Sequence, residues 1–287
     1  MMRGFGPTTV MVWGFIAGCG HGLAQGSLAD ASAQSVEAFP YEVFDRGLRA
    51  HVSAGHVDYA ALRRNSTELR RFTAAVASLG PESRPDLFPD EPARFAYLIN
   101  AYNALAMLNA LDRTPELKTL DDSLTDFFYL TNVRVDRQKT DLYSLENDTI
   151  RPTMRSHYEK LGEASRFGRI HFALNCASES CPRLPSTVFR PDSLEETLDR
   201  ETALFVNDAR NVRSDPASRT VTVSRIFDWY SEDFTDDQSQ TVSVLTWINR
   251  YRPNDAQLDA SYAVEFFAYD WTLNAKSLPS PLNLEEN

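Results

Sequence analysis

The sequence predicts an α+β fold, a mostly helical single domain with a small, largely antiparallel sheet. Of its 287 residues, 43% are apolar, which is enough to build a sizeable core. Apolar residues recur at helical spacing over most of the chain, whereas segments that alternate apolar and polar residues are few and short. Helices with a few scattered strands are typical of α+β proteins rather than of a regular strand–helix repeat.

Helices are predicted where apolar spacing and capping residues coincide. Residues 41–52 carry apolar side chains at helical spacing, and Ser66 is a suitable N-cap for a helix that reaches Leu79. Asp90 is the expected N-cap of the strongest helix, residues 91–111. Both sides of this last helix are apolar or small, so we expect it to be buried nearly all round.

Strands are predicted for short segments only. Residues 133–135 alternate valine with a charged residue, and residues 169–175 alternate strictly, with His171 on the second face. Residues 211–224 have the pattern of a hairpin with two valines on its buried face. Residues 265–271 are the expected last strand.

The N-terminus has the pattern of a secretion signal. Arg3 is the only charged residue before Asp30, and residues 8–17 form an apolar stretch that is too short to span a bilayer as a helix. Two cleavage positions compete, one after Ala24 and one before Cys19 in a lipobox, which would make Cys19 the lipidated first residue. We therefore expect a periplasmic or secreted protein whose membrane contact, if any, is a lipid anchor at Cys19.

The chain divides into four parts by composition. Small and polar residues without core-forming content separate the signal from the regular pattern, and an acidic, proline-containing tail follows that pattern. The predicted parts are a signal peptide at 1–24, a linker at 25–38, a globular domain at 39–276 and a flexible tail at 277–287.

Charge and missing motifs exclude several classes of function. The formal net charge of -11 would repel the backbone of nucleic acids and gains nothing from anionic lipid. No glycine-rich phosphate loop, G-x-S-x-G or H-E-x-x-H motif occurs, so nucleotide-dependent and classical serine-hydrolase chemistry is unsupported and no cofactor is predicted. The acidic run within residues 228–237 lacks the spacing of a calcium loop and is interpreted as a solvated face.

Six segments together resemble one known family in their order and spacing. They are HVDY at 56–59, YLINAYN at 97–103, SLE at 144–146 followed by IR at 150–151, RIHFALNCASESCP at 169–182, VSRIFDWYSEDF at 223–234 and YDWTLN at 269–274. On these segments the chain resembles the DUF547 family from about Phe39 to Asn274, with NCASESCP and YDWTLN as the most specific stretches. The resemblance implies no established activity and no catalytic residues, so function has to be inferred from the residues themselves.

A thiol nucleophile is one interpretation of the two remaining cysteines. On an extended strand Cys176 would lie too far along the axis from His171 for a hydrogen bond. The turn expected at 177–180 would instead bring Cys181 back toward His171. Proline is favoured at the first position of a helix, so Pro182 would make Cys181 the cap of a short helix and lower its pKa. Cys181 is therefore preferred over Cys176 as the nucleophile.

A triad would need a third group to orient His171. Ser144 has the character of an N-cap and would place Glu146 in a first helical turn, which makes Glu146 the expected acid. Asn100 and Asn103 share one face of the buried helix, and either amide is an alternative orienting group or oxyanion donor. In this mechanism the thiolate attacks a carbonyl carbon and His171 moves the proton.

Three other interpretations of the same residues stay open. Cys176 and Cys181 are the pair that remains once Cys19 is cleaved off or acylated, and an even number suits a structural disulfide that would remove both thiols. His171 with the two cysteines would make a metal site, but the spacing is unfamiliar and a fourth ligand is not evident. The cluster would otherwise be packed core.

The sequence thus supports two functions of different classes. The first is a cysteine-dependent hydrolase or acyl transferase that acts on an amide, peptide or thioester in an unknown small-molecule or peptide substrate. The second is a non-catalytic cell-envelope binding or scaffold protein in which a Cys176–Cys181 disulfide pins a loop. The state of the two sulfurs separates them, because the enzyme needs a free thiol within reach of His171.

Overall fold

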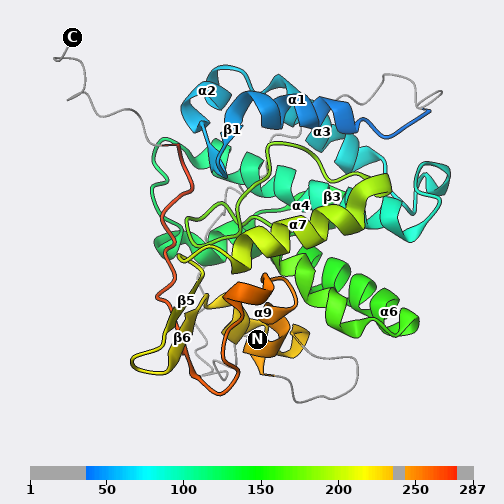
Figure 1. Cartoon of the computed structure of the whole chain (residues 1–287). Helices are drawn as coiled ribbons and strands as arrows, with labels where there is room; N and C mark the ends of the chain where they lie inside the picture. The colour runs from blue at the N-terminus through cyan, green and yellow to red at the C-terminus, as the bar shows by residue number, and fades with distance from the viewer. Residues whose placement is uncertain (1–36, 235–242, 277–287) are drawn as a thin grey trace, which may run out of the picture.

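The structure is a computed structural model, and it describes residues 37–234 and 243–276 (Figure 1). The predicted signal peptide, the Cys19 lipidation site, most of the linker and the tail lie outside the described residues. Within the described part of the chain, no helix is long and apolar enough to cross a membrane.

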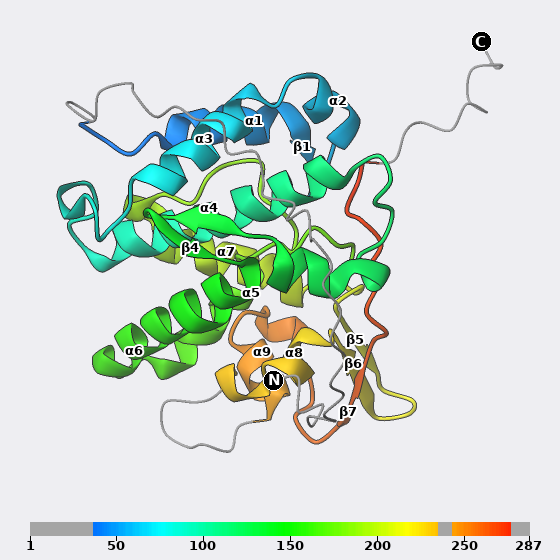
Figure 2. The ribbon, with the colours of Figure 1, turned by 180° about the vertical axis from the view of Figure 1, so that it is seen from behind.

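The N-terminal part is helical, as its apolar spacing predicts. Its elements are α1 (Tyr41–His51), α2 (Tyr59–Arg64), α3 (Thr67–Ser78), the 3-10 helix η1 (Pro85–Leu87) and α4 (Glu91–Arg113). Phe44 of α1 stacks on Phe72 of α3, with ring centroids 4.7 Å apart. Figures 1 and 2 show α1, α2 and α3 together along one side of α4.

The long helix α4 lies at the centre of the first core. Asp90 caps it, because its carboxylate accepts a hydrogen bond from the backbone N–H of Ala93 at 2.9 Å. Every residue from Phe95 to Leu111 is buried, which confirms the prediction of burial on all sides. A helix covered on every face has to satisfy its polar side chains inside the protein, so its asparagines have fixed partners.

A small hairpin of β1 (Val52–Ser53) and β2 (His56–Val57) joins α1 to α2. The middle of the chain contains a second hairpin, β3 (Val133–Val135) with β4 (Gln138–Thr140), and several helices. Its helices are η2 (Asp121–Ser123), the π-helix η3 (Asp126–Leu130), α5 (Leu142–Ser144), the π-helix η4 (Leu145–Ile150), α6 (Arg151–Leu161), η5 (Ala164–Phe172), η6 (Pro191–Ser193) and α7 (Leu194–Val206).

The C-terminal part adds a hairpin, more short helices and a last strand. Its elements are β5 (Val212–Asp215), β6 (Thr220–Val223), α8 (Ile226–Trp229), η7 (Ser231–Asp233), α9 (Val244–Asn249), η8 (Asn254–Ala256) and β7 (Ala263–Phe266). The predicted hairpin is confirmed, with Val221 and Val223 on its buried face. The fold is therefore α+β, mostly helical with small sheets whose pairs are antiparallel except for β6 with β7.

The predicted strand at 169–175 is wrong. Residues 164–172 form the 3-10 helix η5, and the backbone N–H of Ala173 still bonds to the carbonyl of Ile170 at 3.0 Å. The partner of the next residues is a side chain rather than a strand, because Asn103 of α4 bonds the carbonyl of Ala173 and the N–H of Asn175. All residues from 170 to 175 are buried, so their alternation in the sequence does not reflect an exposed face.

Two hydrophobic cores meet at η5. The first surrounds α4, and the second is an aromatic core around the fully buried Trp247. Ile170 belongs to the first core and Phe172 to the second. His171 lies between them in the chain and is 4% exposed. The local fold thus places one imidazole at the junction of the two cores.

The last described residues cross the molecule as an extended strap, residues 267–276. The predicted strand at 265–271 is displaced, since β7 ends at Phe266 after pairing in parallel with β6. Beyond it, single bridges join the strap to three distant segments, Thr119 with Thr272, Ser178 with Leu273 and Val57 with Ala275. Figures 1 and 2 show this red segment along one edge, from the β5–β6 hairpin toward α2.

Candidate functional site

An aromatic cavity of about 870 Å³ includes the predicted cluster, and this is a usual size for a site that binds a small organic molecule. Segments from α4 to the strap contribute to its wall. The lining residues are Tyr102, Leu124, Thr125, Phe128, Tyr129, Tyr143, Glu146, Asn147, Asp148, Arg151, His171, Leu174, Cys176, Cys181, Pro182, Ile226, Trp229, Tyr230, Tyr269 and Trp271. The cavity therefore collects most of the residues that the sequence singled out.

Aromatic rings from two distant segments form one side of this cavity. Trp229 of α8 and Trp271 of the strap lie nearly parallel, with ring centroids 5.7 Å apart and an interplanar angle of 21°. Tyr269 packs against both of them, at 4.7 Å and 4.3 Å. At another point of the wall, Tyr129 and Tyr143 stack 4.4 Å apart and are both partly exposed. The cavity thus offers several flat, electron-rich faces.

Glu146 is held in the cavity by phenols and not by the imidazole. Its carboxylate accepts a hydrogen bond from the hydroxyl of Tyr230 at 2.8 Å and another from Tyr102. Burial and the neighbouring carboxylate raise the pKa of both tyrosines well above the usual range, so both stay protonated and donate. Ser144 is the N-cap residue of the π-helix η4 and Glu146 lies in its first turn, as predicted, although the Ser144 side chain makes no capping hydrogen bond there. Glu146 is therefore a cavity carboxylate rather than the partner of His171.

The acid that orients His171 is Asp233. The imidazole Nε2 lies 2.7 Å from the Asp233 carboxylate, and the imidazole ring stacks on Tyr230 at 4.0 Å. The close approach of η5 to the backbone of Asp233 requires a glycine at position 168, because a Cβ there would lie 2.8 Å from the carbonyl oxygen of Asp233. The interpretation of the acidic run as a solvated face is thus wrong for Asp233, which is 1% exposed.

Two guanidinium groups complete this buried cluster. Arg151 donates to Asp233 from Nε and Nη2 at 3.0 Å and 2.6 Å, and Arg155 donates to the other carboxylate oxygen. Burial raises the pKa of Asp233, but the hydrogen bond from His171 and the Arg151 charge outweigh it and lower the pKa. Burial lowers the pKa of His171 more than Asp233 raises it. A neutral imidazole therefore donates from Nε2 to an ionised carboxylate.

Acid is expected to destabilise the protein through this pair. Because the folded-state pKa of His171 lies below its ordinary value of 6.5, its contribution is fully present above that value and is lost as the pH falls. The unfolding free energy, measured by urea titration between about pH 7 and pH 5, should decrease in the native protein and flatten in His171→Gln. An unchanged slope in His171→Gln would contradict this assignment.

The two cysteines are joined in a disulfide. Cys176 and Cys181 have Cα atoms 6.0 Å apart, so the structural-disulfide interpretation is the one that the structure bears out. The predicted helix at Pro182 is absent, because residues 181–185 form a loop without helical structure. Asn175 shapes this loop instead, as its side chain donates to the carbonyl of Pro182 at 2.7 Å. Cys181 is thus a half-cystine in a loop and not a helix cap.

Asn100 and Asn103 are buried braces of the backbone. Asn100 donates to the carbonyl of Phe189 at 2.7 Å and accepts from the N–H of the same residue at 3.0 Å. Asn103 makes the equivalent pair of bonds to the chain around Ala173 and Asn175, at 2.9 Å and 2.8 Å. Neither amide lines the cavity, so Asn103 positions the chain before the disulfide and Asn100 positions the chain after it.

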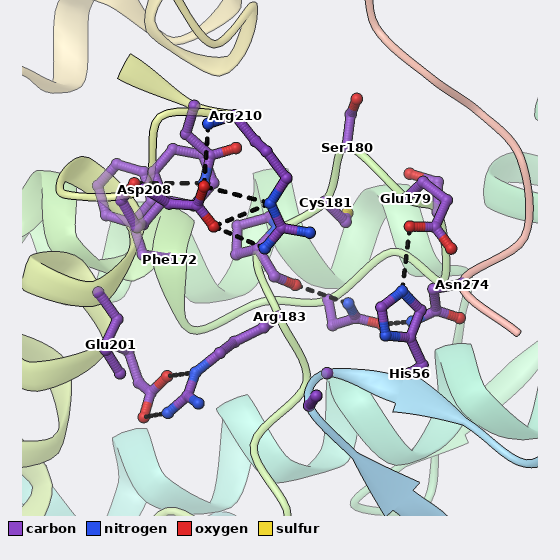
Figure 3. A pocket seen from close by; sticks show the side chains of 18 of the residues that line it. His56, Phe172, Glu179, Ser180, Cys181, Arg183, Glu201, Asp208, Arg210 and Asn274 are labelled. Carbon is purple, nitrogen blue, oxygen red and sulfur yellow. Dashed lines mark hydrogen bonds and ion pairs between the residues drawn. The ribbon is translucent and has the colours of Figure 1, made fainter. Parts of the chain in front are cut away.

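A second, polar pocket lies on the other side of the disulfide (Figure 3). Its volume is about 240 Å³. Three pairs of polar side chains line it, Arg183 with Glu201 at 2.7 Å, Arg210 with Asp208 at 2.6 Å and His56 with Glu179 at 3.2 Å. In the view of Figure 3 the two arginine pairs lie on one side of Cys181 and the His56–Glu179 pair on the other.

Sequence reasoning missed several residues of the site. Asp233, Trp229 and Tyr230 all belong to the VSRIFDWYSEDF stretch, which carried the signal but was interpreted as core and solvated face. A buried carboxylate is not visible in a run of acids, because burial depends on contacts with distant arginines. Among the described residues, no group of three or more His, Cys, Asp or Glu side chains is placed to hold a metal ion.

Comparison with known proteins adds a family and no activity. Residues 88–206 match the family model described as DUF547, protein of unknown function. This stretch includes α4, η5 and the disulfide loop, while Asp233 and the strap lie beyond it. No curated protein and no solved structure matches the chain. The central part of this chain, residues 88–206, is a DUF547 domain.

Proposed function

We propose that this chain is a binding protein whose aromatic cavity holds an organic cation, an ammonium group on a carbon skeleton. The observation that carries the proposal is the Glu146 carboxylate, which faces an aromatic cavity without a cationic side chain as its partner. Among the ion pairs of the described residues, none includes Glu146, and its hydrogen bonds come from neutral phenols. A cation in the cavity would supply the missing charge.

The charges of the cavity wall support a cationic ligand. Its wall contains the carboxylates of Glu146 and Asp148 and one guanidinium, that of Arg151. Arg151 is committed to the buried Asp233 and to Asn147, to which it donates at 2.7 Å. An anionic ligand would therefore meet like charge without a free cation to offset it. A cationic ligand would meet a carboxylate.

The aromatic wall supports the same conclusion. Trp229, Tyr269 and Trp271 all line the cavity, and the faces of aromatic rings attract ammonium groups through the ring quadrupole. In a desolvated site such an interaction contributes about 2 kcal/mol, which exceeds the roughly 1.4 kcal/mol that changes an affinity tenfold. Rings and carboxylate together would select a cation over an uncharged molecule of the same shape.

Binding is favoured over catalysis because the sulfurs are bonded. A disulfide supplies no thiolate, and His171 is engaged by Asp233 in the core junction. We also propose, from the N-terminal pattern, that the protein works outside the cytoplasm. An oxidising compartment would maintain the disulfide.

The proposal predicts selective binding of a quaternary ammonium probe. Choline should quench the fluorescence of the cavity tryptophans and bind measurably by calorimetry to the oxidised protein. Its uncharged isostere, with carbon in place of the quaternary nitrogen, should bind at least about tenfold more weakly. Equal binding of the two molecules, or tighter binding of a neutral sugar, would show that the cavity does not select cations.

Two variants sharpen this test. Glu146→Gln keeps an oxygen acceptor for Tyr230 but removes the charge, so choline affinity should fall about tenfold while the isostere is unaffected. Glu159→Gln removes an exposed carboxylate of α6 that does not line the cavity, and it should leave choline affinity unchanged. If both variants lose choline affinity equally, the loss comes from the net charge of the protein and not from a carboxylate in the cavity.

A second candidate function is a thiol-dependent hydrolase or acyl transferase. The observation that favours it is that Cys176, Cys181 and His171 all line the aromatic cavity. It applies to the reduced protein alone, because the disulfide leaves no nucleophile. Its first requirement is therefore a route by which the disulfide opens.

A further inference from the structure

The disulfide lies in the wall between the two cavities. Cys181 lines both the polar pocket and the aromatic cavity, whereas Cys176 lines the aromatic cavity and not the polar pocket. Both half-cystines are partly exposed. A molecule in the polar pocket therefore meets the sulfur of Cys181 first, with Cys176 on the far side of the bond.

The polar pocket is acidic in sum. Its carboxylates outnumber its guanidinium groups, four to two: Glu179, Glu201, Asp208 and Asp270 against Arg183 and Arg210. Its volume of about 240 Å³ corresponds to roughly eight waters at about 30 Å³ each, so it accepts a small molecule and not a folded partner. A small ligand with an ammonium group matches both its size and its charge.

We propose that the polar pocket is a thiol–disulfide exchange site for small thiols that carry an ammonium group, with Cys181 as the sulfur that is attacked. The ligand class includes free cysteine and cysteamine. The product is a mixed disulfide at Cys181 and a free thiol at Cys176. The inference does not depend on cation binding in the aromatic cavity.

The exchange step balances without an added oxidant or reductant. The small thiol releases its proton to solvent, and its thiolate attacks Sγ of Cys181 to form a new sulfur–sulfur bond. The Cys176–Cys181 bond breaks, and its electron pair goes to Sγ of Cys176, which takes up a proton. One protein disulfide is thus exchanged for one mixed disulfide.

The surroundings of Cys176 favour it as the leaving sulfur. The hydroxyl of Ser178 lies 3.4 Å from its Sγ and is placed to donate to the departing thiolate, and the hydroxyl of Tyr269 lies 3.4 Å from both sulfurs. Donation to a thiolate stabilises it, and exchange is faster when the leaving thiol is more acidic. When a thiol attacks Cys181 from the polar pocket, the Sγ of Cys176 leaves on the side of the aromatic cavity, where these donors lie.

Mass spectrometry tests the site of attack. The oxidised protein is incubated with excess cysteine, quenched with iodoacetamide after increasing times, and digested for peptide mapping. We expect cysteinylation at Cys181 and carbamidomethylation at Cys176 in the early samples. Early cysteinylation at Cys176, or no adduct until the protein is unfolded by urea, would overturn the proposal.

A steric variant tests the route. Leu204 lines the polar pocket on the exposed side of α7, so Leu204→Trp should obstruct the pocket without entering the core. We expect exchange to slow on the order of tenfold, because access of the attacking thiol limits the rate. Leu161→Trp is the matched control, since Leu161 is equally an exposed leucine but lines neither cavity. Equal rates in the two variants would exclude the polar pocket as the route.

The charge of the thiol tests the ligand class. After correction for the fraction of thiolate, cysteamine should react faster than mercaptoethanol, and mercaptoethanol faster than thioglycolate. The differences in exchange rate among the three thiols should be large in the native protein and smaller in Leu204→Trp. No order, or the reverse order, would contradict the assignment of the ligand. Choline binding to the oxidised protein is measured without any thiol, so failure of either proposal is recognised separately.

Discussion

Replacing Asp233 with alanine is expected to lower the free energy of unfolding by about 3 kcal/mol. The side chain of Asp233 is fully buried and is the common partner of His171, Arg151 and Arg155. Its loss leaves an imidazole and two guanidinium groups without the carboxylate that offsets their burial. The estimate is at the lower end for a broken buried ion pair, because Arg151 and Arg155 are 20% and 34% exposed and regain some water.

Urea denaturation followed by far-ultraviolet circular dichroism measures this loss. Asp228→Ala is the matched control, because Asp228 lies in the same acidic run but is exposed, and within the described part of the chain its ion pair is with the i–3 residue Arg225. That change should cost no more than about 0.5 kcal/mol. Asp233→Asn, which keeps the shape without the charge, should fall between the two. If Asp233→Ala were as stable as Asp228→Ala, the buried cluster would have no structural role.

The second large effect is expected for Trp247→Ala, which should destabilise the protein by about 3–5 kcal/mol. Trp247 is fully buried at the centre of the second core, where its ring lies 4.9 Å from that of Phe234 and 5.9 Å from that of Phe172. Truncation removes the largest side chain of that core and leaves a cavity that its neighbours fill only in part.

A graded series separates packing from hydrogen bonding at Trp247. The indole N–H donates to the carbonyl of Ser165 at 2.8 Å. Trp247→Phe keeps an aromatic ring but removes this donor, so we expect it to cost about 1–2 kcal/mol, less than alanine. Thermal and urea unfolding give both values. Equal losses for phenylalanine and alanine would mean that the hydrogen bond, and not the ring volume, stabilises the contact with η5.

The sequence was sufficient for elements that local chemistry determines. Asp90 caps α4 through its own side chain, and the apolar residues of α4 repeat over many turns, so both its start and its burial are predictable. The hairpin of β5 and β6 has a turn that follows Asp215 and begins at Pro216, and its valines alternate. In each of these elements the decisive neighbours lie within a few residues.

The sequence alone was insufficient to predict the local structure and the site partners that depend on contacts between residues far apart in the chain. Residues 169–175 alternate as a strand would, yet Asn103, some seventy residues earlier, satisfies the backbone there and leaves no place for a neighbouring strand. Glu146 was expected beside His171, but Tyr230 binds it from 84 positions away. The disulfide was predictable as one of several states because its two cysteines are close in the chain.

The strap has a consequence for the order in which the protein is built. Residues 267–276 are synthesised after β1, β2, α4 and the disulfide loop, and they bridge to Ser178, Thr119 and Val57, of which Val57 lies more than two hundred positions before its partner Ala275. Contacts of such long range form late and slowly. While the ribosome still holds these residues, the aromatic cavity lacks Tyr269 and Trp271, and the polar pocket lacks Asp270 and Asn274. The α4 core can therefore assemble before either cavity is complete.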